Sequence, residues 1–508
     1  MNQKREAVLI SYLNLVLGMI VNIFLIPLMI KFFGDVDYSI YKVMQSFAGP
    51  LSMFHLGIST VVTRSIVKYH SDDHYTEKDK QNTMAMSLLV SGLMSLIVVI
   101  AGVGMYMAIP SMYGDSYAAE SLVLGRKIFS VFVLSSILHM MTDAFSGCVV
   151  GREKFVISAM VPLIKTVLKV VLMSVFLLCG MNVFYIALAD LLIAIFTFAI
   201  LFLYAIFGLS EIPRLHYWDK RQLVEIFSFG IAILLQAIVN QVNNNMDTMI
   251  LGAFVEEKSI ITMYSSALTV YAIYNSLVSV ITNFFLPKAT RLISHNASGK
   301  ELTDFVISPG RFQAILAVAC IFGFSLFGRN FISIWIGDQY MDAYWVTLVL
   351  MIPVTIPLVE NAMIAILDAS LKRMYRSVVL VVMAVINVII SVVLVKMIGF
   401  WGAAIGTFAS LIIGHGILMN IYYAKTFKME IGRMFRSIFK GVLPAGIVSG
   451  IVCIPLAIFV ENTLIFFLIK CASFMVVYAL FLWLFGLNSF EKGMIKEMFI
   501  KIKSKIRG

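Results

Sequence analysis

The chain consists of long apolar runs that short polar stretches interrupt at roughly regular intervals. At about 20 apolar residues per membrane span, this pattern predicts fourteen transmembrane helices. Six of them lie in the first half and eight in the second. The predicted spans are residues 7–31, 39–63, 84–109, 127–149, 155–179, 183–207, 224–252, 259–286, 305–328, 342–367, 375–396, 400–424, 440–460 and 463–486.

The composition agrees with a membrane protein. Hydrophobic residues make up 60% of the 508 residues and charged residues 13%, and the mean hydropathy is +0.94. A soluble chain would carry about 25% charged residues. The predicted connectors are short, so we expect a polytopic, all-α membrane protein without an extramembrane domain. The five cysteines fall in apolar runs and have neither metal-site nor disulfide spacing.

The distribution of Lys and Arg orients the predicted spans. With the N-terminus inside, the cytoplasmic segments hold 28 of these cations and the outer segments hold six. This bias obeys the positive-inside rule, so both termini are predicted to be cytoplasmic. The net charge of +11 is therefore explained by membrane topology, and we expect no nucleic-acid partner.

An internal repeat suggests two lobes with the same topology. Gly180 opens the sixth predicted span and Gly399 the twelfth, and the segment 63–66 (Thr-Arg-Ser-Ile) is echoed by 290–293 (Thr-Arg-Leu-Ile). Such matches imply parallel six-helix repeats around a central cavity. The predicted domains are an N-terminal lobe (1–207), a cytoplasmic connector (208–222), a C-terminal lobe (223–424), a cytoplasmic amphipathic linker (425–439), two extra spans (440–486) and a basic cytoplasmic tail (487–508).

The seventh predicted span carries an unusual polar face. Asn240, Asn243, Asn244 and Asp247 share one side of the helix. A polar stripe is costly in a membrane unless it faces protein or a water-filled cavity. We therefore predict that Asn240, Asn244 and Asp247 bind substrate. For Asp247 a sugar contact, a proton site and a brace between helices all remain open.

Two lysines stand within the fifth predicted span. Lys165 and Lys169 are four residues apart, so they share a helix face and repel each other. A substrate phosphate between them would relieve this repulsion. Pairing with Asp143 and Asp190 on neighbouring spans is the alternative, and the sequence does not decide between the two.

Other ionisable residues also fall within predicted spans. Lys42 lies near the outer end of the second span, and Glu360 follows Pro353 and Pro357 in a helix that these prolines can break. Both are candidates for the cavity, and Glu360 is also a candidate proton relay. Lys470 lies in the extra C-terminal pair, and the histidines are interpreted as packed residues. No motif for hydrolysis, nucleotide binding or zinc is present, so we predict a transporter without a resident cofactor and not an enzyme.

The order of short motifs resembles one family. The opening reads Ser11-Tyr-Leu, Pro27, Phe33-Gly34, Tyr38, Tyr41, Leu56-Gly-Ile-Ser-Thr60 and Arg64; further on come Met246-Asp247-Thr-Met-Ile-Leu-Gly252, Tyr264-Ser-Ser-Ala267, Leu286-Pro287, Asn387 and Gly399-Phe-Trp-Gly-Ala-Ala404. Together they resemble the polysaccharide repeat-unit flippases of the multidrug/oligosaccharidyl-lipid/polysaccharide exporter superfamily.

The resemblance implies the fold of the superfamily's multidrug exporters, with two six-helix lobes and two added C-terminal helices. It also implies a flippase that moves an undecaprenyl-pyrophosphate-linked oligosaccharide to the outer leaflet of the bacterial cytoplasmic membrane. Membrane lipids, a glycan polymerase and glycosyltransferases are the expected partners, and protons or sodium ions could drive transport. The alternatives are a cation-coupled drug exporter, a lipid II flippase and a membrane glycan polymerase or ligase. The first span offers Asn14 and Asn22 where lipid II flippases place cavity arginines, and the short outer connectors disfavour a polymerase.

Overall fold

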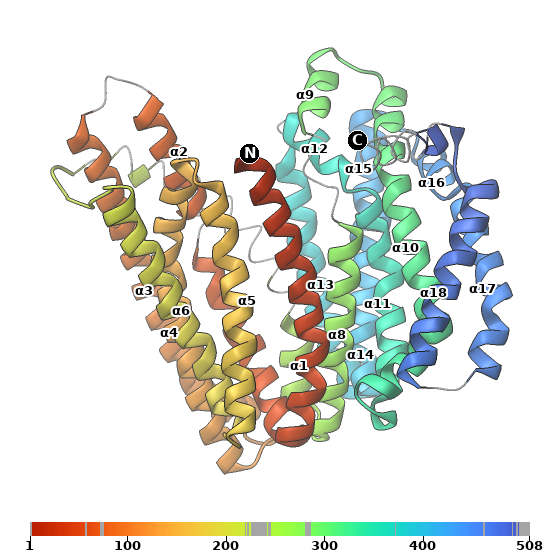
Figure 1. Cartoon of the computed structure of the whole chain (residues 1–508), viewed down its shortest axis with the longest axis horizontal. Coiled ribbons are helices and arrows are strands. Elements are labelled where there is room, and N and C mark those ends of the chain that lie inside the picture. Colours follow the sequence, from red (N-terminus) through yellow and green to blue (C-terminus); the bar gives the residue numbers. More distant parts are fainter. Residues whose placement is uncertain are drawn as a thin grey trace, which may run out of the picture. The chain divides into compact units, whose positions relative to one another are not determined.

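A computed structural model gives the structure of the chain (Figure 1). It describes residues 3–55, 58–71, 76–218, 220, 223–224, 241, 245–279, 286–370, 372–460, 463–489, 491–493 and 496. These residues form helices and turns, and none of them lies in a β-strand. The expectation of an all-α protein is therefore confirmed.

The chain forms two compact units. The first comprises Met1–Ser265 and Val392–Ala403, and the second comprises Ser266–Ser391 and Ala404–Gly508. The predicted lobe boundaries at residues 207 and 424 stay predictions.

The first unit is built on four helix pairs. Helix α1 packs on α5, α4 packs on both α6 and α3, and α2 packs on α4. These helices are α1 (Gln3–Ala48), α2 (Ile58–Ser71), α3 (Glu77–Tyr113), α4 (Ala119–Gly151), α5 (Phe155–Leu178) and α6 (Val183–Leu203). The unit also contains a 3₁₀ helix η1 (Gly49–His55), a π-helix η2 (Tyr204–Gly208), the first part of α8 (to Ser265), the end of α13 (from Val392) and the start of α14 (to Ala403). Helix α4 also contacts α1 and α5, so it touches all the other helices from α1 to α6 and forms the centre of this unit.

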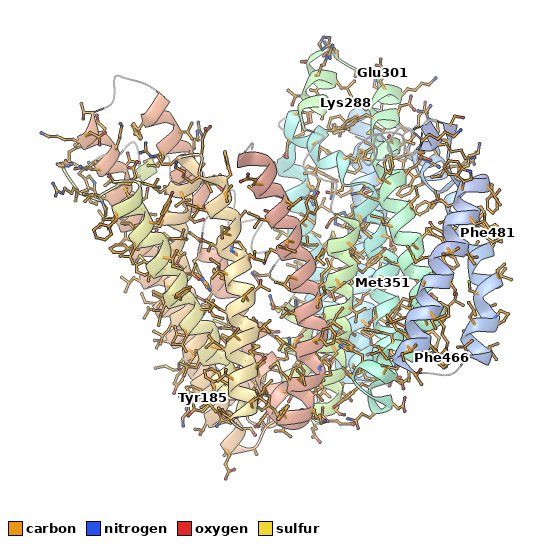
Figure 2. All side chains as sticks on the ribbon, viewed as in Figure 1. Tyr185, Lys288, Glu301, Met351, Phe466 and Phe481 are labelled. Carbon is orange, nitrogen blue, oxygen red and sulfur yellow. The ribbon has the colours of Figure 1, made fainter. Side chains whose placement is uncertain are left out.

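The second unit is organised around the long helix α10, which packs on α11, α16, α17 and α18. Its elements are α8 (Lys258–Val278, from Ser266 onward), α9 (Leu286–Ser294), α10 (Gly299–Trp335), η4 (Asp338–Tyr340), α11 (Asp342–Val359), α12 (Ala362–Ala369), α13 (Arg373–Ile398, as far as Ser391), α14 (Phe400–Leu411, from Ala404), η5 (Ile412–Met419), α15 (Asn420–Phe427), α16 (Ile431–Phe439), α17 (Val442–Phe459), α18 (Leu464–Phe481) and η6 (Leu482–Gly486). Figure 2 places Lys288 and Glu301 at the same end of this unit, opposite Phe466.

Eleven helical stretches among the described residues are long and apolar enough to cross a membrane, so this is a multi-pass membrane protein. Three features account for the difference from the predicted fourteen. The first predicted span and the greater part of the second, as far as Ser52, lie in one helical stretch, Leu9–Ser52. The seventh, 224–252, lies mostly outside the described residues. The eighth corresponds to α8, which is rich in Ser, Thr and Tyr and is not among the eleven.

Helix α1 consists of two helices joined at a kink, because Gly34 has φ 70° and ψ 178°, which is not helical and redirects the chain. A residue with a side chain is strained at this φ. Gly180 and Gly399 also have positive φ, 65° and 64°, just before α6 and α14. These two glycines were matched by the predicted repeat, and their φ angles are nearly equal.

Three of the predicted spans are interrupted, and for one of them, 342–367, the prolines had indicated a possible break. The span 39–63 changes to the 3₁₀ helix η1 at Gly49-Pro50. The span 342–367 breaks at Glu360, behind Pro353 and Pro357, each of which removes a helical hydrogen-bond donor. The span 400–424 contains the π-helix η5. There the Asn420 amide donates to the carbonyls of His415 (2.9 Å) and Gly416 (3.3 Å).

The predicted amphipathic linker contains α16, and the structure shows what its apolar face contacts. Met434 and Ile438 are fully buried, and α16 packs on α10, whereas Arg436 is exposed. The amphipathic pattern therefore serves packing within the second unit.

A buried arginine joins four segments of the second unit. Arg311 of α10 forms an ion pair with Glu491, with Nε 2.7 Å from Oε1. It also donates to the carbonyls of Ser437, Lys440 and Gly486 at 2.7–2.9 Å. Arg311 is 6% exposed and Glu491 3%. The arrangement ties the ends of α16 and η6 and the segment that follows η6 to α10.

We expect Arg311→Gln to destabilise the protein by about 3–5 kcal/mol, because it leaves the Glu491 carboxylate buried without its counter-charge. Arg433→Gln is the matched control, since Arg433 pairs with Asp304 at the exposed surface, where such a pair contributes about 0–1 kcal/mol. The melting temperature of the detergent-purified protein measures both. Equal melting temperatures for the two variants would contradict the assigned role of Arg311.

Candidate functional site

The first unit contains a cavity of about 470 Å³ among α1, η1, α4, α5 and α6. Its size falls in the usual range of ligand sites, about 300–1,000 Å³. Its wall is rich in polar side chains although it lies between apolar helices. The lining residues are Gln45, Ala48, Gly49, Ser52, Phe132, Ser135, Ser136, His139, Lys165, Thr166, Lys169, Asp190 and Ile193.

Both predicted lysines of α5 line this cavity. Lys165 is the eleventh residue of the helix and Lys169 the fifteenth of 24, so they lie about 15 and 21 Å along its axis. This is the middle of a span, where an uncompensated charge is most costly. The structure therefore places two cations at mid-depth on a shared polar surface.

Lys169 has a carboxylate neighbour, as required by the prediction that the lysines pair with aspartates on neighbouring spans. Its Nζ lies 3.5 Å from Asp190 Oδ1, and the Tyr41 hydroxyl donates to Asp190 Oδ2 at 3.4 Å. Charge-assisted hydrogen bonds are about 2.7–2.9 Å long, so this ion pair is loose. The side chains are 32% and 23% exposed. Lys169 can therefore turn toward another anion at modest cost.

The other predicted charges of the first unit are near the same cavity. Asp143 on α4 is close enough to Lys165 for their charges to interact. Lys42 interacts electrostatically with Lys169 and Asp190, and its Nζ is 3.5 Å from the Gln45 side-chain oxygen. Three lysines and two aspartates, drawn from four helices, thus form one network with a net positive charge.

Several lining residues were missed by the sequence analysis. Ser135, Ser136 and His139 of α4 face the cavity with Gln45 of α1, and the prediction had placed His139 in packed surroundings. Thr166 also lines the cavity, and its hydroxyl donates to the Asn14 side chain at 2.9 Å, which joins α5 to α1. The available signal was the spacing of Ser135, Ser136 and His139, which share a helix face.

The predicted amide face can be followed only in part, because Asn240 and Asn244 lie outside the described residues. Two amides of the same stretch that were not predicted do contact the cavity wall. The Gln241 side chain donates to the Ser52 hydroxyl, and the Asn245 amide donates to the Gln241 carbonyl at 3.2 Å. A Cβ on Gly49 would lie 2.7 Å from Asn245 Nδ2. Glycine at this position allows the amide to approach the wall.

Asp247, the predicted carboxylate of this stretch, forms a hydrogen bond with helix α8. It is 3% exposed, and its Oδ2 accepts a hydrogen bond of 2.7 Å from the Tyr264 hydroxyl of α8. Among the described residues it is not part of the cavity lining. Of the three roles left open by the sequence, this geometry favours the brace between helices.

Glu360 belongs to the second unit. It follows the last residue of α11, is 3% exposed and lies close enough to the Asn420 side chain to interact with it electrostatically. Tyr423 is close enough to interact with its charge. Glu360 therefore lies in a buried polar cluster at two helix interruptions. Lys470 of α18 is 1% exposed.

A family model described as "Polysaccharide biosynthesis protein" matches residues 5–293, more than half of the chain. No curated protein matches the chain in sequence.

Solved structures with the same fold are transporters. A structure titled "Lipid II flippase MurJ, inward closed conformation" has 15% identity and a TM-score of 0.72, and the match covers 94% of this chain and 97% of that one. An inward-facing multidrug resistance transporter of the MATE family and MOP superfamily has 13% identity and a TM-score of 0.62, with 82% and 94% covered. A MOP superfamily transporter from Pyrococcus furiosus has 14% identity and a TM-score of 0.51, with 85% and 98% covered. The prediction of a MATE-like fold agrees with these matches.

If the cavity of the first unit holds water, a cysteine in its wall should react with a charged thiol reagent. We expect Ser136→Cys, in a background without the five native cysteines, to be modified by an anionic methanethiosulfonate. Leu134→Cys is the matched control, because Leu134 lies on the same helix but is 52% exposed on a face that would contact lipid. Mass spectrometry measures the modification. Equal modification of the two variants would contradict a hydrated cavity.

Proposed function

Because the chain belongs to the polysaccharide biosynthesis protein family, we propose that it is a lipid-linked oligosaccharide flippase. It moves an undecaprenyl-pyrophosphate-linked unit of capsule, O-antigen or a similar surface glycan from the cytoplasmic to the outer leaflet by alternating access. The single observation that carries this proposal is the set of lysines in the polar cavity of the first unit.

The lysines suit a pyrophosphate. Lys165 and Lys169 line the cavity within one turn of α5, and Lys42 contributes a third nearby positive charge. A lysine ammonium offers three donors and binds phosphate as a point charge. Such a group removes the repulsion between the two lysines. Asp143 and Asp190 balance the cations when the cavity holds no anion.

The remaining polar groups suit a glycan. Hydroxyls, amides and a histidine line the cavity, and such groups exchange hydrogen bonds with sugar hydroxyls. Asn240 and Asn244 are assigned to the same task on the sequence alone, because they share one predicted helix face. Asp247 would act by positioning this helix through Tyr264.

The two alternative transporters, a lipid II flippase and a cation-coupled drug exporter, share the fold and differ in cargo. The match to the lipid II flippase concerns the fold, and the cations that line the described cavity are lysines. A cation-coupled drug exporter would depend on the buried cluster at Glu360 more than on these lysines. The cargo proposed here follows the family and the cations together.

The proposal also extends to the protein's location, its partners and its energy source. We infer that it lies in the bacterial cytoplasmic membrane with both termini cytoplasmic, since the basic segments would then face the cytoplasm. The lipid-linked glycan and membrane lipids are its direct partners. A glycosyltransferase supplies the substrate and a polymerase consumes it. A proton or sodium gradient is the proposed energy source, with Glu360 as the candidate ion site and no resident cofactor.

The double variant Lys165→Ala, Lys169→Ala should abolish surface glycan at normal membrane levels of the protein. Each hydrogen bond to a charged group contributes about 1.5–3 kcal/mol, so each loss weakens binding roughly 10- to 100-fold. Glycan staining of cells and immunoblotting of membranes measure the outcome. Lys127→Ala, an exposed lysine of α4, is the control. Normal surface glycan in the double variant would refute the assignment.

Asp190→Asn separates the two interpretations of Lys169. If Lys169 serves only to pair with Asp190, the Asn variant should lose as much transport as Lys169→Ala. If Lys169 binds the substrate anion, the Asn variant should keep substrate binding, because a competing carboxylate has been removed. Flipping rates in proteoliposomes distinguish these results, and equal loss in both variants would favour the structural role.

Deletion of the gene should cause a lipid-linked intermediate to accumulate in the cytoplasmic leaflet. Mass spectrometry of extracted lipids is expected to show undecaprenyl pyrophosphate that carries a complete oligosaccharide. Accumulation of lipid II would instead identify the substrate as a peptidoglycan precursor. Drug sensitivity without any lipid-linked intermediate would support the exporter.

A further inference from the structure

The first unit also contains an apolar groove between α3 and α4, of about 370 Å³. Its residues follow helical spacing on both walls. The α3 wall is formed by Val99, Gly102, Val103 and Tyr106, and the α4 wall by Phe129, Ser130, Val133, Leu134 and Ile137. The one hydroxyl on the α4 wall, that of Ser130, donates to the Arg126 carbonyl at 2.9 Å. The groove therefore offers hydrocarbon contacts and little else.

The groove opens toward the membrane. Val99, Val103 and Leu134 at its rim are 38%, 49% and 52% exposed, although both helices are long enough to span the bilayer. Its floor includes Gly102, where a Cβ would lie 3.0 Å from Val133 Cγ1. The small residue deepens the groove. The polar cavity uses other residues of α4 (Phe132, Ser135, Ser136 and His139), so the groove and the cavity are distinct.

A cation stands at one end of the groove. The Arg126 guanidinium stacks 4.0 Å over the ring of Tyr106, which lines the groove. Arg126 lies two turns into α4, about 10 Å from its start, which is near headgroup depth. Its Nε is buried, and in the described part of the chain it has no hydrogen-bond partner. Stacking fixes the guanidinium, but no carboxylate within the described residues is found to neutralise it.

We propose that this groove binds one anionic phospholipid of the surrounding membrane, with an acyl chain between α3 and α4 and the phosphate at Arg126. The groove is apolar along its length and cationic at one end, which matches the polarity of a lipid. The single cation suits the one negative charge of a phosphodiester, whereas the lysine-rich cavity suits a diphosphate. In the topology proposed above, the lipid belongs to the outer leaflet.

The test uses the full chain, purified in a nonionic detergent and depleted of lipid. Native mass spectrometry counts bound dioleoylphosphatidylglycerol and dioleoylphosphatidylcholine, which share their acyl chains. We expect the lipid-depleted wild type to bind one molecule of phosphatidylglycerol. Arg126→Gln should weaken this binding about tenfold, because a charge-assisted contact is lost, and should abolish the preference over phosphatidylcholine. Val103→Trp should fill the groove and reduce binding of both lipids.

Two matched variants serve as controls. Lys127→Gln removes an exposed neighbouring cation, and Ile100→Trp adds the same bulk at a position of α3 that is 65% exposed and outside the groove. Both should bind lipid as the wild type does. Val99→Trp replaces Val103→Trp if the latter does not elute as a monodisperse protein.

Three results would overturn the proposal. The first is unchanged phosphatidylglycerol binding in both Arg126→Gln and the groove-filling variant. The second is an equal effect of Lys127→Gln, which would indicate a diffuse surface charge. The third is displacement of the bound lipid by undecaprenyl phosphate at equimolar concentration, which would assign the groove to a transport substrate. None of these measurements involves transport. A result that overturns the lipid site therefore does not overturn the proposed function, and the reverse also holds.

Discussion

A charge in the hydrocarbon of a bilayer costs at least about 2.5–3.5 kcal/mol unless water or a counter-charge compensates it, and this constraint governs the arrangement of ionisable residues in both units. The structure meets it in two ways. Arg311 is enclosed by Glu491 and three carbonyls, so its charge is satisfied within the protein. Lys165 and Lys169 instead line a polar cavity. The first solution fixes a structure, and the second leaves cations available to a ligand.

The same constraint applies to the backbone, because lipid offers no partner for a freed carbonyl or amide. The interrupted helices carry polar side chains where hydrogen bonds are lost. Asn420 serves the carbonyls exposed by η5, and Glu360 stands where α11 ends. Interruptions of this kind are tolerated only where protein or a water-filled cavity surrounds them. They therefore identify the inner side of the second unit, where a polar cluster has formed.

Much of this could be predicted from sequence, because spans and helix faces depend on local periodicity. The common face of Lys165 and Lys169 and the positive-φ glycines at 180 and 399 are examples. Features that depend on distant contacts could not be predicted. Glu491 lies 180 residues from Arg311, and Gln45 and His139 reach the cavity from different helices. A connector at 32–38 was predicted between the first two spans, but the structure joins them at Gly34, where one residue with positive φ redirects the chain without a loop.

Helix α4 shows how one span can serve two environments. Ser135, Ser136 and His139 face the cavity, while Val133, Leu134 and Ile137 face the apolar groove. A flippase must bind an anion and then release it, and a tight permanent ion pair or an unpaired cation would each hinder one of these steps. The loose contact between Lys169 and Asp190 avoids both extremes. In the proposed function, Asp190 competes with the substrate phosphate for the Lys169 ammonium, and release of the substrate would restore the pair. Affinity is lowered by this competition, but the cavity always retains a counter-charge for Lys169.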